Sequence, residues 1–228
     1  TQVSWIWKRA KGFFDVVCYS GNSTANTGII HNLGVIPELT MVKMRSDFQP
    51  WGSEAWQVAT TAMHSSNQRL VLNNNSAIAG GASAWSGADD STKSHFYVSG
   101  DNSVNGSGFN YIMFHFASLA GVSKVGSYTG TGDASAQTID CGFSNGARFV
   151  LIKCTSHAGQ WYIFDTDRGI TSTNSDGVLM LNLTNAEQTE SSFFGSAVDP
   201  MQPHSSGFKV QYSDLNTSGR TFIFYAIA

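Results

Sequence analysis

The side chains most able to do chemistry in this sequence are carboxylates beside an arginine. Asp165, Asp167 and Arg168 lie within one short stretch. Carboxylates this close could bind Ca²⁺, but the stretch lacks EF-hand spacing, and no glutamate follows where a bidentate ligand would be needed. We therefore predict an ion pair that closes a turn, and no metal site.

Large aromatic residues inside polar, glycine-rich segments point to a second kind of chemistry. Trp51, Trp85 and Phe194 are of this kind, and Asp89 and Asp90 follow Trp85 closely. An aromatic ring can lie against the apolar face of a sugar, while neighbouring polar side chains bind its hydroxyls. These five residues are the candidate glycan-binding residues. The alternative is that each ring anchors its loop in the core and that the acidic pair is a solvated loop tip.

Catalytic and cofactor chemistry finds little support in the sequence. The six histidines form no His-x-x-x-His pair and lie near no nucleophile elbow. Gly130-Thr131-Gly132 is followed by no Lys-Ser/Thr, so it is predicted to be a hairpin turn. Acidic pairs suited to glycoside hydrolysis are few. We expect no catalytic residue, no metal and no cofactor, and hence no enzyme.

Composition indicates which structure must position these residues. The 228 residues are 41% apolar and only 13% charged, with 23 glycines. Few good helix formers and frequent Gly-Ser-Asn clusters favour short strands joined by turns. A net charge of −3 offers no footprint for nucleic acid, and no apolar run is long enough to span a bilayer. We expect neither partner. The three cysteines cannot all pair, so buried free thiols are expected, which fits a protein assembled in a reducing cytoplasm.

The chain repeats itself once. Gly12–Gly21 matches Gly121–Gly130, and the closing segment Asn105–Ala117 matches Asn216–Ala228. The other matched blocks, in the same order, are Leu39–Lys43 with Phe149–Lys153, Trp56–Val58 with Trp161–Ile163, Leu70–Asn73 with Leu179–Asn182, and His95–Val98 with Gly207–Val210. The nearly continuous apolar runs Leu39–Lys43 and Phe149–Lys153 are predicted to be central strands covered on both faces.

The repeat defines the predicted fold. A period of about 110 residues is far longer than the repeats of about 20 to 50 residues that build solenoids and propellers. We predict an all-β protein of two tandem antiparallel β-sandwich (jelly-roll-like) modules, produced by internal duplication. The modules span residues 12–118 and 119–228, and residues 1–11 form an N-terminal arm.

The arm carries Trp5, Trp7 and Arg9. Two indoles left in water would form an adhesive apolar surface, so the arm is expected to dock against a neighbouring subunit. Trp5, Trp7 and Arg9 are therefore the predicted oligomer or neighbour contacts.

Each copy carries longer motifs that go beyond the strand pattern. The first copy has Trp7-Lys8-Arg9-Ala10-x-Gly12-Phe13-Phe14-Asp15, then His31-Asn32-Leu33-Gly34. The second has Lys124-Val125-Gly126-Ser127-Tyr128, and Trp161-x-x-x-Asp165-x-x-Arg168-Gly169. These motifs resemble a repeat of virion structural proteins from marine and cyanobacterial tailed phages, and the resemblance covers nearly the whole chain. The first copy departs from it, with Trp56-Gln57-Val58-Ala59-Thr60-Thr61 in place of the Asp-x-x-Arg-Gly element.

The resemblance implies a structural, tail-fibre-like protein of the virion without catalytic residues. It also implies a homo-oligomer, with a trimer favoured, that contacts other virion proteins. We expect part of a tail fibre, spike or other exposed appendage that touches host-surface glycans. The alternatives are a capsid decoration protein or a stand-alone carbohydrate-binding module; a glycan-cleaving enzyme is the third class considered.

Overall fold

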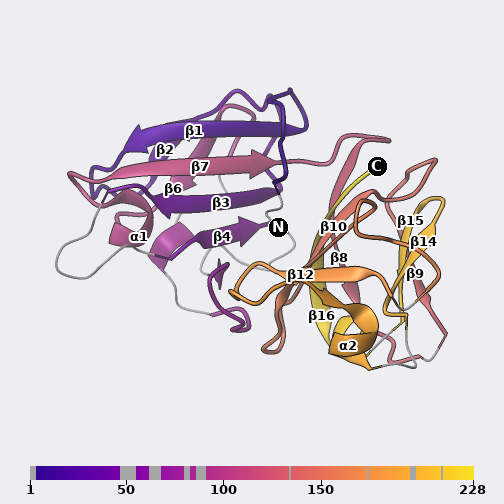
Figure 1. Ribbon diagram of the computed structural model, residues 1–228. Helices are drawn as coiled ribbons and strands as arrows, with labels where there is room; N and C mark the ends of the chain where they lie inside the picture. Colours follow the sequence, from indigo (N-terminus) through magenta and orange to yellow (C-terminus); the bar gives the residue numbers. More distant parts are fainter. Residues whose placement is uncertain are drawn as a thin grey trace. The chain divides into compact units, whose positions relative to one another are not determined.

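The chain forms two compact β units in the computed structural model (Figure 1). The first comprises residues 1–69 and 80–118, and the second comprises residues 70–79 and 119–228. The residues that the structure describes are 4–46, 55–61, 68–79, 83–85, 91–133, 135–173, 175–195, 199–211 and 213–228.

The first unit is built on two antiparallel sheets. Its larger sheet contains, in spatial order, β1 (Phe14–Ser20), β7 (Asn110–Phe116), β3 (Leu39–Met44) and β4 (Gln57–Thr60). Its smaller sheet pairs β2 (Thr27–Ile30) with β6 (His95–Val98). Two single-turn helices accompany them, η1 (Ser83–Trp85) and α1 (Asn102–Asn105).

The second unit also has two antiparallel sheets. The larger one runs β13 (Gln188–Thr189), β12 (Gly177–Met180), β11 (Trp161–Asp165), β10 (Phe149–Cys154), β16 (Thr221–Ile227) and β8 (Ser123–Thr129). The smaller one runs β14 (Met201–His204), β15 (Gly207–Val210) and β9 (Gln137–Asp140). The short helices are α2 (Glu190–Phe194) and α3 (Ser213–Asn216), and the two-residue strand β5 (Leu70–Val71) lies in the part of the unit taken from earlier in the chain.

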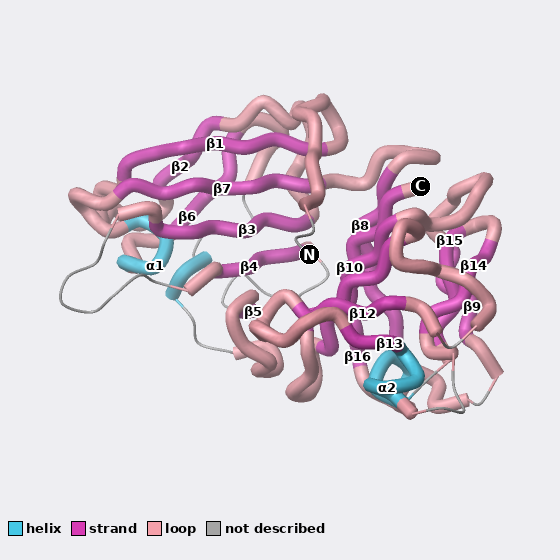
Figure 2. The backbone as a smooth tube through the Cα atoms, viewed as in Figure 1, coloured by secondary structure: helices cyan, strands magenta, loops and turns pink. Residues whose placement is uncertain are grey.

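The two units share one strand order. The order β1-β7-β3-β4 in the first corresponds to β8-β16-β10-β11 in the second, and the pair β2–β6 corresponds to β9–β15. Figure 2 shows how strands dominate both units, with helices confined to short turns. The antiparallel all-β fold predicted from the sequence is confirmed, and the strands of the two units follow the repeated register of the sequence.

The two strands predicted to be central lie inside their sheets. β3 lies between β7 and β4, and β10 lies between β16 and β11. Every residue of β10 is buried, including Lys153. A strand covered on both faces has no solvent-facing side, so it loses the alternation of apolar and polar residues seen in half-exposed strands.

A tyrosine holds the short helix in each unit. The Tyr19 hydroxyl donates to the Val104 carbonyl of α1 at 2.5 Å, and the Tyr128 hydroxyl donates to the Leu215 carbonyl of α3 at 2.7 Å. A helix of four residues leaves most of its carbonyl groups without an intrahelical partner. The repeated tyrosine therefore satisfies a helix-end carbonyl and ties the helix to the first strand of its unit.

A glycine follows each of these tyrosines because the backbone passes too close for a side chain. A Cβ added to Gly21 would lie 2.2 Å from the Gly106 carbonyl oxygen, and one added to Gly130 would lie 2.2 Å from that of Thr217. Both distances are far below van der Waals contact. The Tyr-x-Gly pattern found twice in the sequence thus fixes the same close crossing of two chain segments in each unit.

Residues 70–79 belong to the second unit, although the sequence register places them in the first module. Their backbone is bonded to that unit: the Gly159 N–H donates to the Asn75 carbonyl at 2.8 Å, and the Ile78 N–H donates to the Thr155 carbonyl at 2.9 Å. The predicted module of residues 12–118 is corrected accordingly. Sequence similarity reports which strands are equivalent, whereas these hydrogen bonds depend on the path of one connecting segment.

Candidate ligand-binding pocket

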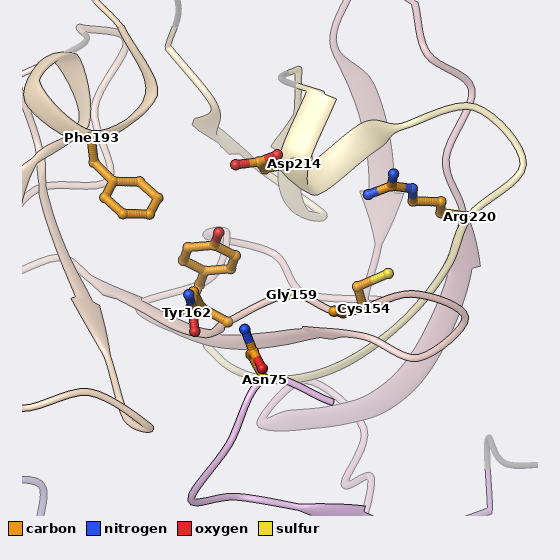
Figure 3. Close-up of a pocket in the computed structure, with 9 residues that line it drawn as sticks. Asn75, Cys154, Gly159, Tyr162, Phe193, Asp214 and Arg220 are labelled. Atoms are coloured by element: carbon orange, nitrogen blue, oxygen red, sulfur yellow. The ribbon is translucent and has the colours of Figure 1, made fainter. Parts of the chain in front are cut away.

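The second unit contains a pocket of about 220 Å³ (Figure 3). Strand ends, a tight connection, two short helices and segment 70–79 all contribute to its wall. The lining residues are Asn75, Cys154, Ala158, Gly159, Gln160, Tyr162, Phe193, Asp214 and Arg220.

The floor of the pocket is the connection between β10 and β11. These strands pair antiparallel up to Lys153 and Trp161, so residues 154–160 must reverse the chain direction. Segment 70–79 lies against this connection through the hydrogen bond from Gly159 to the Asn75 carbonyl. That contact places Asn75 at the edge of the pocket, below Tyr162 in Figure 3.

Two aromatic rings form one side of the pocket. The Tyr162 side chain comes from β11, and the Phe193 side chain comes from α2; their ring centroids are 5.9 Å apart with an interplanar angle of 70°. Tyr162 is buried and Phe193 is half-buried against the core. The Thr189 side chain accepts from the Ser192 N–H at 3.3 Å and caps α2, which fixes the helix that carries Phe193.

A carboxylate and a guanidinium group form the other side. Asp214 lies in α3, and Arg220 lies just before β16 after a turn in which its N–H donates to the Thr217 carbonyl at 3.1 Å. Figure 3 shows the Tyr162 hydroxyl turned toward Asp214, with Arg220 on the far side of the cavity. Asp214 is exposed and Arg220 is half-exposed, and within the described ranges neither forms an ion pair.

The Tyr162 hydroxyl is a neutral polar group in this site. Burial raises the pKa of Tyr162 well above its ordinary value, and the negative charge of Asp214 raises it further. The hydroxyl therefore keeps its proton at neutral pH. As far as the structure describes the chain, no protein group is hydrogen-bonded to it, so both its donor and its acceptor capacity are open to a ligand.

Two residues of the pocket differ from those at the equivalent positions of the first unit. In the matching strand register, Gln57 of the first unit stands where Tyr162 stands in the second, and Phe109 stands where Arg220 stands. Tyr162, Phe193, Asp214 and Arg220 were not among the predicted ligand-binding residues. Two of them could have been found by comparing the repeats, because the copies differ in polarity at Gln57 and Tyr162 and at Phe109 and Arg220. Such differences mark positions with a separate role in the second copy.

Two of the rings predicted to bind glycans are buried in the units instead. Trp85 is 1% exposed and packs edge-on against Phe96 at 5.8 Å, and Phe194 is 5% exposed within the core of the second unit. Neither ring offers a face to a ligand, so the prediction for Trp85 and Phe194 is wrong. Burying a large aromatic ring is favourable enough to outweigh the tendency of its polar sequence neighbours to stay in solvent. The remaining candidates Trp51, Asp89 and Asp90 lie outside the described residues.

The tryptophans of the N-terminal arm lie partly against their own unit. Trp7 is half-buried, and its ring centroid lies 6.1 Å from that of Phe14 and 5.8 Å from that of Phe116. Trp5 is also half-buried. The expectation that these indoles need a neighbouring subunit to cover them is corrected for Trp7, because Phe14 and Phe116 of the same chain already cover part of its ring.

Arg9, the third arm residue, forms an ion pair with Asp15. Its Nε donates to Asp15 Oδ1 at 2.7 Å, while the arginine side chain stays 56% exposed. Burial raises the pKa of Asp15, but the N–H of Asn32 and the Arg9 guanidinium outweigh it and leave the pKa below its ordinary value. Arg9 therefore stabilises a buried carboxylate of its own unit; its contact with a neighbouring subunit stays a prediction.

The turn after β11 is held by the ion pair that the sequence predicts. The Arg168 guanidinium pairs with Asp165 Oδ2, and Asp165 Oδ1 accepts from the backbone N–H groups of Asp167 and Arg168, both at 3.1 Å. The Arg168 Nε atom also lies 3.4 Å from Glu187 Oε2. The carboxylate is thus used by the turn, as predicted. In the first unit Thr60 occupies the position of Asp165.

The described residues contain neither a metal-binding cluster nor a membrane-spanning helix. Across the described ranges, no group of three or more His, Cys, Asp or Glu side chains is arranged to hold a metal ion. In the same residues, no helix has the length and apolar character that crossing a membrane requires.

Comparison with known proteins identifies the family. A family profile described as "Domain of unknown function (DUF7483)" matches residues 1–228, and the chain belongs to this family. No curated protein and no solved structure matches the chain.

Proposed function

We propose that this DUF7483 protein is a non-catalytic structural component of a tailed-phage virion, part of a tail fibre, spike or other exposed appendage, whose second unit binds a host-surface glycan. The observation that carries the binding role is the pocket formed by Tyr162, Phe193, Asp214 and Arg220. The virion setting is supported by the resemblance of both sequence copies to phage structural repeats.

The chemistry of the pocket suits a sugar. Phe193 and Tyr162 offer aromatic surface to the apolar face of a pyranose ring, and the Tyr162 hydroxyl, Asp214 and Asn75 offer hydrogen-bonding groups to its hydroxyls. Hydroxyls bound by charged or fixed polar groups give specificity. A cavity of about 220 Å³ has room for a single sugar residue, with the remainder of a glycan chain outside.

The pocket supports binding and not cleavage. Most glycoside hydrolases place two carboxyl groups on either side of the scissile bond. Among the described residues that line this pocket, Asp214 is the one that carries a carboxyl group. A single carboxylate can accept hydrogen bonds from a sugar, but it cannot serve both roles of that mechanism.

A glycan array probed with the purified chain tests the binding role. We expect binding that falls about tenfold in Phe193→Ala, which corresponds to loss of about 1.4 kcal/mol of contact energy. Val122→Ala is a matched control, since it also removes a partly exposed apolar side chain but lies outside the pocket. An array without any signal, or equal binding by both variants, would contradict the proposal.

The virion role has a separate test. Antibody labelling and mass spectrometry of purified phage particles should place the chain in a tail appendage, and light scattering should report a homo-oligomer, with a trimer favoured. Labelling of the capsid would favour a decoration protein. Absence from the particle, together with a monomeric chain that still binds glycans, would favour a stand-alone carbohydrate-binding module.

A further inference from the structure

The pocket pairs one positive and one negative side chain across a small space. Arg220 precedes β16, and Asp214 lies in α3. Neither is neutralised by an ion pair within the described part of the chain. A ligand that fills the pocket therefore meets both a cation and an anion.

The backbone around Arg220 holds this residue in a defined place. Its carbonyl accepts from the Gly130 N–H at 2.8 Å, and its own N–H donates to the Thr217 carbonyl at 3.1 Å. The next residue, Thr221, pairs with Thr129 of β8. The guanidinium group is thus attached to a fixed strand end. Its planar donors match the two oxygens of a carboxylate, which they can bind in parallel.

Asp214 restricts which anion can enter. Its carboxylate repels negative charge, so a group with two charges is disfavoured more than a group with one. The same carboxylate accepts hydrogen bonds from hydroxyl groups. The two requirements together describe a molecule with one carboxylate on one edge and hydroxyls on the other.

We infer that the sugar bound in this pocket is an acidic one, a uronic acid or a related carboxylated sugar, with its carboxylate on Arg220 and its hydroxyls on Asp214. This inference rests on the proposed glycan-binding function. It is carried by the unpaired Arg220 and Asp214 of the described chain, which line a pocket that also has an aromatic wall. The first unit has Phe109 at the position of Arg220, so this selectivity belongs to the second unit.

Calorimetric titration of the full chain with methyl β-glucuronide and with methyl β-glucoside tests the inference. The two probes differ in one group: the glucuronide has a carboxylate where the glucoside has a hydroxymethyl group. We expect the glucuronide to bind at least about tenfold more tightly, since hydrogen bonds to charged groups are stronger than those between neutral groups. Arg220→Ala should remove this preference, and Arg220→Lys should keep part of it. Asp214→Asn should weaken the binding of both probes equally, or weaken that of the glucoside more than that of the glucuronide.

Phe109→Ala is the matched control, because it changes the equivalent position of the first unit and should leave both affinities unchanged. Thermal melting of each variant shows that the fold persists. If glucoside and glucuronide bind the wild-type chain equally, or if glycans bound on the array carry no acidic sugar, the inference is overturned while the glycan-binding function stands. If the array gives no signal at all, the proposed function fails, and the inference fails with it.

Discussion

The ammonium group of Lys153 lies 6.0 Å from the centre of the Trp161 ring, and the two residues face each other across β10 and β11. Both side chains are fully buried. The Lys153 Nζ donates to the Cys154 carbonyl at 2.6 Å and to the Asn75 carbonyl at 3.4 Å. A buried cation thus joins β10, which leads into the pocket floor, to segment 70–79, which lies at the edge of the pocket.

Replacing this lysine should destabilise the second unit. We expect Lys153→Ala to lower the free energy of unfolding by about 3 kcal/mol, because it leaves a cavity and unpairs two carbonyls. Lys153→Met should lose less, since its chain fills most of the space. Urea denaturation at pH 7 measures both. Equal losses in the two variants would show that the ammonium group, and not the packing of its stem, dominates.

Lys153 also gives stability a pH dependence. Burial lowers its pKa from 10.5 to about 8, with the neighbouring Cys154 opposing this shift. Between these values the unfolded chain binds more protons than the folded chain, so the free energy of unfolding should rise as pH increases from about 8 to 10.5. Lys153→Met should flatten this rise in denaturation curves across that range. An unchanged slope in the variant would assign the rise to other groups.

Glu190 should act in the opposite direction. Burial in α2 raises its pKa from 4.5 to about 9, and the charges of Asp199 and Asp176 add to the shift. Its contribution is fully present below about pH 4.5 and is lost as pH rises through about 9, because the folded state must then hold a buried carboxylate. Glu190→Gln should be more stable than wild type at pH 9 but not at pH 5. Ser192→Ala, an exposed change in the same helix that alters no titratable group, is the control and should keep the wild-type dependence.

Trp85→Ala should affect stability and not glycan affinity. The ring is buried against Phe96 in the first unit, so its loss should lower the free energy of unfolding by about 4 kcal/mol. Chemical denaturation and the glycan array, performed on the same preparation, separate the two effects. A variant of wild-type stability with lost binding would return Trp85 to the role of a ligand-contacting residue.

Asp165→Asn should weaken the turn after β11. The Arg168 guanidinium would lose the closer and more buried of its two charged partners at a position where its side chain is largely buried, at a cost of about 3 kcal/mol. Asp167→Asn is the matched control within the same turn. Asp167 is exposed, and its change should stay within about 0.5 kcal/mol. Similar melting temperatures for the two variants would show that the ion pair contributes little.

The strands and their repeated order could be predicted because their signals are local and repeated. Apolar runs mark β3 and β10, and the Tyr-x-Gly pattern recurs where Gly21 and Gly130 permit a close crossing. The ion pair of Asp165 with Arg168 was also predictable, since the two residues are three apart. Each of these features depends on residues close in sequence or aligned between the copies.

The pocket could not be predicted in the same way. Phe194 was the expected ligand contact, whereas its neighbour Phe193 lines the pocket. Consecutive residues of a helix point about 100° apart, so the orientation of α2 on the core decides which ring is buried. Sequence spacing does not report that orientation. The burial of Trp85 was unpredictable for the same reason, because a glycine-rich sequence around it does not indicate how deeply η1 packs into its unit.

An antiparallel all-β chain with a repeated strand register could be predicted from the amino-acid sequence, because backbone pairing and burial follow short-range patterns of apolar residues, turns and glycines. That one pocket is shared by Asn75, Tyr162, Phe193, Asp214 and Arg220 followed only from the folded structure. These residues come from segments far apart in the chain. Packing and hydrogen bonds between those segments, such as the bond from Gly159 to the Asn75 carbonyl, bring them together.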